Sequence, residues 1–407
     1  VAAGRLPAIP RLMVLKSDDP DELGVRPELV RQLSSFVEEL ETEAFVDAIE
    51  GDRAEGAGGA DSDDAKPRSC GLPSFRRHAE VETDFGWVLQ RMIERSLRTD
   101  NGSKTSLEKL TARIRIFEDH TFTFNLGSGE TATFTECRST QFRRLRAAAG
   151  ISEEDYAKSL CSQAFKGHSG QGGKSGALFL KSHDDQFILK TIEEHEFACL
   201  KDILPNYLLY LEENRASLLS RFYGAYALTI GRVTLRVVVM NNCLRGQQLQ
   251  IYDLKGTTED RWVDPGVHAV LKDNNFSPHV MLFNAARVKH LRAVIQDDAE
   301  FLESCGLMDY SLLVGVAMSP PPGDDGGERS GLGVHSGWLR TGEEEPARFF
   351  QLGIIDYLQR WTPKKVAAHW LKKFTIGCVN EIDTEPPAVY CARFSKYFCV
   401  KIDSKTC

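Results

Sequence analysis

The sequence predicts an α+β fold in which an antiparallel sheet packs against one or two helices, and three observations support this prediction. Short segments alternate between apolar and polar residues, which is typical of half-buried strands. Turn-forming residues at 125–129 separate two of them, and the apolar segment 186–192 runs directly into a helical pattern. The expected strands are 113–117, 121–124, 132–134, 186–192, 222–229 and 235–240, and the expected helical segments are 85–96, 142–165, 193–204 and 285–304.

The second half of the chain predicts a second, smaller α+β lobe. It opens with an extended segment at 252–255 and contains short strands at 311–316 and 349–355. Residues 319–348 are rich in Pro, Gly and charge, so we expect a disordered insertion there. The predicted organisation is a terminal region at 1–75, a first lobe at 76–242, a second lobe at 243–318 and 349–400, and the insertion at 319–348.

The first 75 residues differ from the rest in composition. Apolar residues at helical spacing between 27 and 49 predict an amphipathic acidic helix, and a linker rich in Gly, Ala, Asp and Ser follows at 51–72. Between 37 and 66 there are eleven acids and two bases, a local net charge of −9 in a chain of net charge −8. The remaining residues are nearly neutral, which argues against a general nucleic-acid-binding protein.

Cysteine spacing and hydropathy exclude further classes of protein. The ten cysteines include no CxxC pair, so neither a zinc ribbon nor a thioredoxin-type redox pair is predicted, and a reducing cytosol is expected. No apolar run approaches the roughly 20 residues that span a bilayer. The sequence begins with Val1 rather than Met, so we expect it to be part of a longer chain.

A glycine-rich segment at 167–176 lies between two predicted strands. Its Gly-Lys-Ser sequence lacks the upstream glycine of a Walker A loop, because that position is His168, and Ser175 lacks the following glycine of a hydrolase elbow. What remains is either an ordinary flexible hairpin or one whose backbone N–H groups bind phosphate.

The next strand carries Lys190, and the helix after it carries Glu193, Glu194 and Glu196. A strand lysine that reaches phosphates and is held by a helix carboxylate is the arrangement of protein kinases. The alternative is a surface lysine whose stem covers apolar side chains.

Two aspartates follow apolar segments, Asp309 in MDYSLL and Asp356 in GIID. Phosphoryl transfer requires one carboxylate for Mg²⁺ and another for the attacking hydroxyl, although both residues could instead be structural carboxylates at strand ends. Asp253 and Lys255 stand two apart on an extended segment, so their side chains are expected to point the same way and pair.

A basic cluster follows Asp356. It has five bases and no acid between 357 and 375, interleaved with aromatic residues. Such a composition suits a surface that meets anionic lipid head groups, or else forms a solvated helix face.

In their order, these segments resemble the phosphatidylinositol phosphate kinases, which convert a monophosphorylated inositol lipid into the bisphosphate. The resemblance runs from about Phe85 to Phe398, and MDYSLLVG followed by GIID is its most specific part. It is carried by the segments Phe142–Tyr156, Gly173–Gly176, Ile188–Thr191, Phe222–Gly224, Val238–Asn242, Tyr252–Gly256, Met308–Gly315, Gly353–Asp356 and Arg393–Phe394.

The resemblance implies a bilobal kinase-like fold with a flat basic membrane-facing surface, and a role for each matching residue. Asp309 would be the catalytic aspartate, with Lys255 and Asp253 of DLKG beside it, and Asp356 would hold Mg²⁺. ATP would be bound by Gly172, Gly173, Ser175, Gly176, Lys190, Glu196, Met240 and Asn242. The lipid head group would be bound by Lys174, Lys364, Lys365, Ala368, Lys372 and Lys373.

The sequence departs from the family pattern at two positions, and the second bears on the substrate. DLKGT replaces the usual DLKGS, which keeps a hydroxyl group. Ala368 stands where the 4-phosphate 5-kinases carry Glu and the 5-phosphate 4-kinases carry Ala, whereas 204–207, 218–226 and 239–242 resemble the 5-kinases more.

We therefore expect an ATP- and Mg²⁺-dependent kinase at the cytosolic face of membranes that makes phosphatidylinositol 4,5-bisphosphate, most simply from the 4-phosphate. The alternatives are a 5-phosphate 4-kinase and a phosphoinositide-binding scaffold with little turnover. Family members often dimerise, so a homodimer is expected too. A third hypothesis is that the acidic region 1–75 folds over the basic cluster and inhibits it, because the two have opposite charges.

Overall fold

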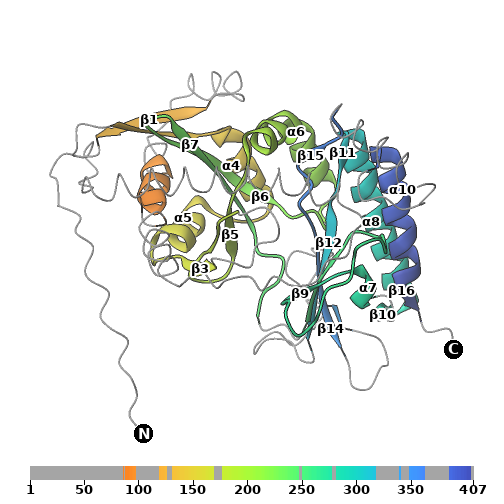
Figure 1. Cartoon of the computed structure of the whole chain (residues 1–407). Coiled ribbons are helices and arrows are strands. Elements are labelled where there is room, and N and C mark those ends of the chain that lie inside the picture. Colours follow the sequence, from red (N-terminus) through yellow and green to blue (C-terminus); the bar gives the residue numbers. More distant parts are fainter. Residues whose placement is uncertain are drawn as a thin grey trace, which may run out of the picture.

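The computed structural model describes residues 86, 88–97, 119–125, 131–168, 177–246, 250–276, 281–317, 339–340, 348–362 and 385–404. The expected acidic helix, the linker and the strand at 113–117 lie outside these residues. Within them the chain is α+β, with mainly antiparallel sheets, as predicted (Figure 1).

The first sheet has seven strands, all antiparallel to their neighbours. In spatial order they are β1 (His120–Asn125), β2 (Thr131–Glu136), β6 (Phe222–Ile230), β7 (Val233–Asn241), β5 (Phe187–Thr191), β4 (Phe179–Lys181) and β3 (Lys166–His168).

Both faces of this sheet are covered, which explains the unbroken apolar run in β7. Val237 and Val239 pack with helical residues 88–97 and with α5 (Glu153–Cys161). Val238 and Met240 point to the opposite face, where α4 (Ser139–Ala148) and α6 (Glu194–Glu213) lie. A strand buried on two faces needs apolar side chains at every position.

The second sheet has five strands, all from the second half of the chain. Its spatial order is β13 (Leu339–Arg340), β14 (Phe349–Ile355), β12 (Ser311–Ala317), β8 (Gln250–Leu254) and β9 (Val270–Leu271), with only β8 and β9 parallel. Two short pairs accompany it, β10 (Met281–Phe283) with β16 (Ile402–Ser404) and β11 (Leu307–Met308) with β15 (Gln359–Arg360).

Helices α8 (Ala285–Ser304) and α10 (Pro387–Lys401) lie side by side against this second sheet, and the short α7 (Asp273–Phe276) follows β9 (Figure 1). Their buried residues belong to one continuous core that also contains residues of α4, α6 and β7. The two sheets are therefore joined through packed side chains around α6.

Three predictions need correction. The segment 142–165, expected to be helical throughout, forms two helices, α4 and α5, with residues 149–152 between them and no helix after Cys161. The helix expected to end at Leu204 continues to Glu213 with Pro205 inside it. Burial of Leu204, Tyr207 and Leu208 in the core offsets the hydrogen bond that proline removes. Within the expected insertion, Leu339 and Arg340 form a strand paired with β14, so the prediction of disorder was wrong for these two residues.

Asp298 of α8 ties the two parts of the fold together from a fully buried position. Its carboxylate accepts hydrogen bonds from the Tyr210 hydroxyl of α6 and from the backbone N–H of Leu218, both at 2.7 Å. Burial raises the pKa of Asp298 to about 6, although bonds from Ser217, Tyr210 and Leu218 oppose the rise.

This raised pKa predicts how Asp298→Asn changes stability with pH. In the unfolded chain Asp298 should titrate near its ordinary value of 3.8, so between pH 4 and 6 the folded state holds a proton that the unfolded state lacks. The stability that Asp298 contributes must therefore fall as pH rises through this window. As pH rises through this window, the free energy of unfolding of Asp298→Asn should increase by about 2–3 kcal/mol relative to that of the native chain. Above the window the difference should stay constant.

Urea unfolding at intervals from pH 4.5 to 7.5 measures this difference. Asp264→Asn, at an exposed position of another segment, is the control and should follow the native chain closely. A constant difference between Asp298→Asn and the native chain across the range would contradict the prediction.

Candidate active site

Three strands of the second sheet bring the candidate residues to one edge. β8 and β14 both run antiparallel to β12, so their last residues lie beside its first. Ile355 is opposite Ser311, and Leu254 is opposite Leu312. Lys255, Asp309 and Asp356 therefore emerge together just beyond this edge, although they are far apart in the sequence.

Lys255 and Asp309 form an ion pair there. The Lys255 ammonium donates a hydrogen bond to Oδ1 of Asp309, and both side chains are only partly exposed. Asp309 has a φ of 66°, in the left-handed region that aspartate enters more readily than most residues. Next to it, the buried Tyr390 hydroxyl of α10 donates to the backbone carbonyl of Tyr310. Helix α10 thus fixes the backbone that presents Asp309.

The predicted pairing of Asp253 with Lys255 was wrong. Lys255 bonds to Asp309, whereas the carboxylate of Asp253 lies 3.6 Å from the guanidinium of Arg261. The same guanidinium donates to the backbone carbonyl of Asp253 at 2.6 Å. Two side chains on one face of a strand need not meet when each has a closer partner of opposite charge.

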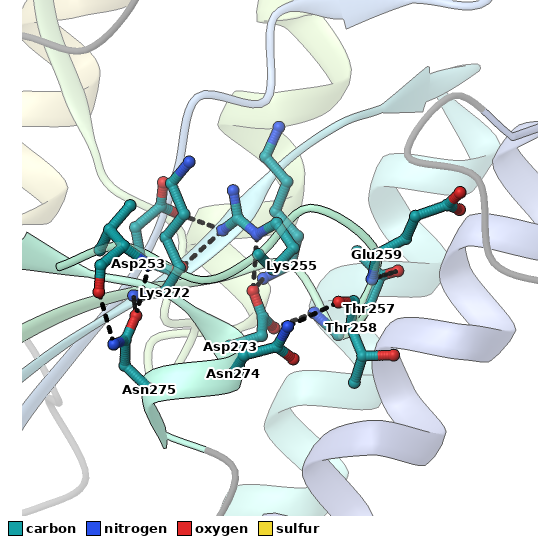
Figure 2. A network of polar contacts seen from close by, with 12 residues as sticks. Asp253, Lys255, Thr257, Thr258, Glu259, Lys272, Asp273, Asn274 and Asn275 are labelled. Carbon is teal, nitrogen blue, oxygen red and sulfur yellow. Dashed lines mark hydrogen bonds and ion pairs between the residues drawn. The ribbon is translucent and has the colours of Figure 1, made fainter. Parts of the chain in front are cut away.

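Asp273 holds the segment that carries Lys255, and sequence reasoning missed it. Figure 2 shows its carboxylate directed at that backbone, where it accepts from the N–H groups of Lys255 at 3.2 Å and Gly256 at 2.8 Å. It also accepts from Nε of Arg261 at 2.7 Å. Burial raises the pKa of Asp273, while Arg261 and the two backbone bonds oppose that rise. No sequence pattern links Arg261, which lies between β8 and β9, with Asp273, the first residue of α7.

Gly256 explains how closely α10 approaches this segment. Its φ is +74°, and a Cβ added there would lie 3.3 Å from the Cα of Phe394 and 3.2 Å from the Cβ of Tyr397. Any larger residue would strain the backbone and push against the helix. Glycine at this position therefore lets α10 pack directly on the Lys255 segment.

Lys190 reaches the same edge from the first sheet. Its ammonium donates to Oδ1 of Asp356 at 2.6 Å, and the two side chains are 14% and 52% exposed. Burial lowers the pKa of Lys190, but the attraction of Asp356 and Glu196 outweighs it and leaves the pKa raised. The lysine ammonium also lies 5.6 Å from the centre of the Phe179 ring.

Glu196 belongs to the first turn of α6, near Lys190. Its carboxylate completes a capping box by accepting from the N–H of Glu193 at 2.9 Å, and it accepts from the Gln359 amide at 3.4 Å. The predicted strand lysine, helix carboxylate and downstream aspartate thus come together, with Asp356 as the direct partner of Lys190.

Met240 and Asn242 lie where β7 leaves the first sheet. Met240 is buried in the shared core. Asn242 donates through its backbone N–H to the carbonyl of Gln186 and through its amide to the carbonyl of Asp185. These bonds fix the connection between the two sheets.

The remaining predicted site residues lie outside the described part of the chain. They are Gly172, Gly173, Lys174, Ser175, Gly176, Lys364, Lys365, Ala368, Lys372 and Lys373. The strands that flank the glycine-rich segment, β3 and β4, pair antiparallel with His168 opposite Phe179.

The donor set at the edge suits Mg²⁺ as far as the described residues extend. Among them there is no group of three or more His, Cys, Asp or Glu side chains placed to hold a metal ion. Mg²⁺ characteristically takes one or two protein carboxylates and completes its shell with water and phosphate oxygens, so the partly exposed carboxylate of Asp356 fits it. No helix among the described residues has the length and apolar character needed to cross a membrane.

Comparisons with known proteins identify the family of the chain. A family model described as phosphatidylinositol-4-phosphate 5-kinase matches residues 160–336 and 337–401, more than half of the chain.

Among the similar curated proteins is mouse phosphatidylinositol 4-phosphate 5-kinase type-1 beta, 37% identical over 43% of this chain and 34% of that protein. The mouse type-1 alpha enzyme is 31% identical over 65% of this chain and 56% of its own length. A probable phosphatidylinositol phosphate kinase of Dictyostelium discoideum is 28% identical over 64% of this chain and 46% of its length.

The chain thus spans between about a third and just over half of the length of these relatives. The match confirms the resemblance that the motifs predicted. The chain belongs to the phosphatidylinositol phosphate kinase family.

Proposed function

We propose that the chain transfers the γ-phosphoryl group of ATP to an inositol hydroxyl of a phosphatidylinositol monophosphate. The observation that carries this proposal is the meeting of the Lys190–Asp356 and Lys255–Asp309 ion pairs at one sheet edge. In this proposal the two sheets correspond to the two lobes of a kinase, with ATP between them.

Lys190 binds the phosphates of ATP in this mechanism. Its raised pKa keeps the ammonium charged, and a bound phosphate replaces Asp356 as its partner or shares it. The backbone of Gly172, Gly173, Ser175 and Gly176 covers the phosphates, while Met240 and Asn242 border the adenine.

Asp309 orients the attacking hydroxyl and accepts its proton. The hydroxyl oxygen forms a bond to the γ-phosphorus as the bond to the β–γ bridging oxygen breaks, which leaves ADP and a new phosphate ester. Lys255 holds Asp309 and supplies positive charge beside the transferring group. Asp356 would hold Mg²⁺, which neutralises the phosphate charge that develops during transfer.

We propose phosphatidylinositol 4-phosphate as the substrate and the 4,5-bisphosphate as the product. The names of the mouse relatives support this choice, while Ala368 favours the 5-phosphate as the alternative substrate. Lys174, Lys364, Lys365, Lys372 and Lys373 bind the anionic head group on a flat basic face. In this proposal the enzyme works at the cytosolic side of a membrane as a homodimer.

Asp309→Asn should reduce phosphate transfer to lipid by about 10²- to 10⁴-fold, because an amide cannot accept the proton. Nucleotide affinity should stay close to that of the native chain. Initial rates with ATP and phosphatidylinositol 4-phosphate vesicles measure the loss. Asp185→Asn is a matched control, since Asp185 also has a positive φ and pairs with a lysine, Lys166. Native-like rates for Asp309→Asn would refute its role.

Lys190→Met should weaken ATP binding at least tenfold, since the ammonium that meets the phosphates is lost. Titration of a non-hydrolysable ATP analogue measures the change. Lys201→Met removes another partly buried lysine, paired with Asp119 at 2.7 Å, and should bind as the native chain does. Equal affinities for both variants would argue against a phosphate contact by Lys190.

Side-by-side rates on vesicles with the 4-phosphate or the 5-phosphate test the substrate. We expect a preference for the 4-phosphate. Faster reaction with the 5-phosphate would make Ala368 the deciding residue, and lipid binding without transfer to either would support a scaffold instead.

A further inference from the structure

Asp356 has a backbone conformation that its neighbours must impose. Its φ of 59° lies in the left-handed region, which is unfavourable for a residue with a Cβ even though aspartate tolerates it better than most. The position of its carboxylate relative to Lys190 therefore depends on how the residues before and after it are held.

The residues before Asp356 are held on both sides. In β14, Ile354 is opposite Leu312 of β12. On its other side, Ile354 donates to the carbonyl of Leu218 at 2.7 Å and accepts from the N–H of Ser220 at 2.8 Å. The strand is thus fixed up to Ile355, one residue before the turn.

The residue after Asp356 is held by the same segment, residues 218–220. Tyr357 is fully buried, and its hydroxyl donates to the carbonyl of Ser220 and lies 3.0 Å from the hydroxyl of Tyr207. Its ring packs edge to face on Phe222, with centroids 5.4 Å apart. Ser220 therefore binds Ile354 through its N–H and Tyr357 through its carbonyl, so one residue fixes both sides of Asp356.

Tyr207 extends this contact to α6. Its hydroxyl donates to the Ser220 carbonyl at 2.9 Å and accepts from the N–H of Phe222 at 3.2 Å. The same helix carries Glu196, which lies close enough to Lys190 to raise its pKa. Helix α6 thus contacts both the surroundings of Lys190 and the segment that holds Asp356.

We propose that Tyr357 is a positioning residue that fixes the carboxylate of Asp356 through hydrogen bonds to Ser220 and Tyr207. This inference rests on the proposed function, in which Asp356 holds the magnesium ion of Mg·ATP. Loss of the hydroxyl alone leaves the ring in place but releases the turn on one side.

The test uses Tyr357→Phe in the full chain and measures the Mg²⁺ concentration that half-saturates binding of a non-hydrolysable ATP analogue. We expect that concentration to rise about fivefold, the effect of one lost hydrogen bond. With lipid substrate, kcat should fall more than the KM for ATP rises. Tyr207→Phe should act in the same direction, and the double variant should lose less than the sum of both because the two hydroxyls share the Ser220 carbonyl.

Tyr226→Phe is the matched control. Tyr226 is also fully buried, and its hydroxyl lies 3.3 Å from that of Tyr156 in the other core. Its loss should lower the melting temperature without moving the Mg²⁺ midpoint. An unchanged midpoint in Tyr357→Phe, or an equal shift in Tyr226→Phe, would overturn the inference.

The same measurements separate this inference from the proposed function. If the native chain binds the nucleotide with Mg²⁺, and the Mg²⁺ midpoint shifts in Tyr357→Phe but not in Tyr226→Phe, the positioning role is supported even if no lipid is phosphorylated. If lipid is phosphorylated and the native chain and Tyr357→Phe depend on Mg²⁺ in the same way, the positioning role is refuted while the proposed function stands. Nucleotide binding by the native chain that does not depend on Mg²⁺ also refutes it.

Discussion

The ion pair between Lys190 and Asp356 joins the two sheets at the point where the candidate site lies. Lys190 lies in β5 of the first sheet, and Asp356 follows the last residue of β14 in the second. Because Asp356 is half exposed, the pair contributes little to stability, about 0–1 kcal/mol. The ion pair matters for the geometry of the site. Its two side chains can meet only if the two sheets keep a fixed separation, and the core around α6 maintains that separation.

The second sheet supplies the rest of the site through its connectivity. An antiparallel order of β8, β12 and β14 places two strand ends and one strand start at the same edge. Asp309 and Asp356 each leave that edge with a positive φ, which turns their carboxylates away from the strand direction. Each of these turns is followed by a fully buried tyrosine, Tyr310 or Tyr357, whose packing offsets the backbone cost. The two polar turns thus depend on the apolar core directly beneath them.

Local patterns predicted several of the elements and singled out the principal charged residues. The helix 285–304 and the strands around 311–316 and 349–355 follow from periodicity, and the structure confirms them with boundary changes of at most one residue. Lys190, Asp309 and Asp356 stand out because charged groups adjoin apolar strands. The continuation of α6 through Pro205 was missed because tertiary burial outweighs local propensity.

Partners that are distant in the sequence could not be predicted in the same way. Lys255 was assigned to Asp253 two residues away, yet its carboxylate partner is Asp309, 54 residues away. Asp273 and Arg261 gave no sequence signal, because a carboxylate that binds two backbone N–H groups is recognisable only once the chain has folded. The contacts of Tyr357 with Tyr207, 150 residues away, belong to the same class.

The central claim is that the aspartate paired with Lys190 serves phosphoryl transfer, and Asp356→Asn tests it most directly. Asp403→Asn is a fair comparison, since Asp403 is 57% exposed and pairs with an arginine, Arg292. Single-turnover transfer from radiolabelled ATP to phosphatidylinositol 4-phosphate should fall by at least about 100-fold in Asp356→Asn and stay native-like in Asp403→Asn. Equal rates in the two variants would contradict the claim.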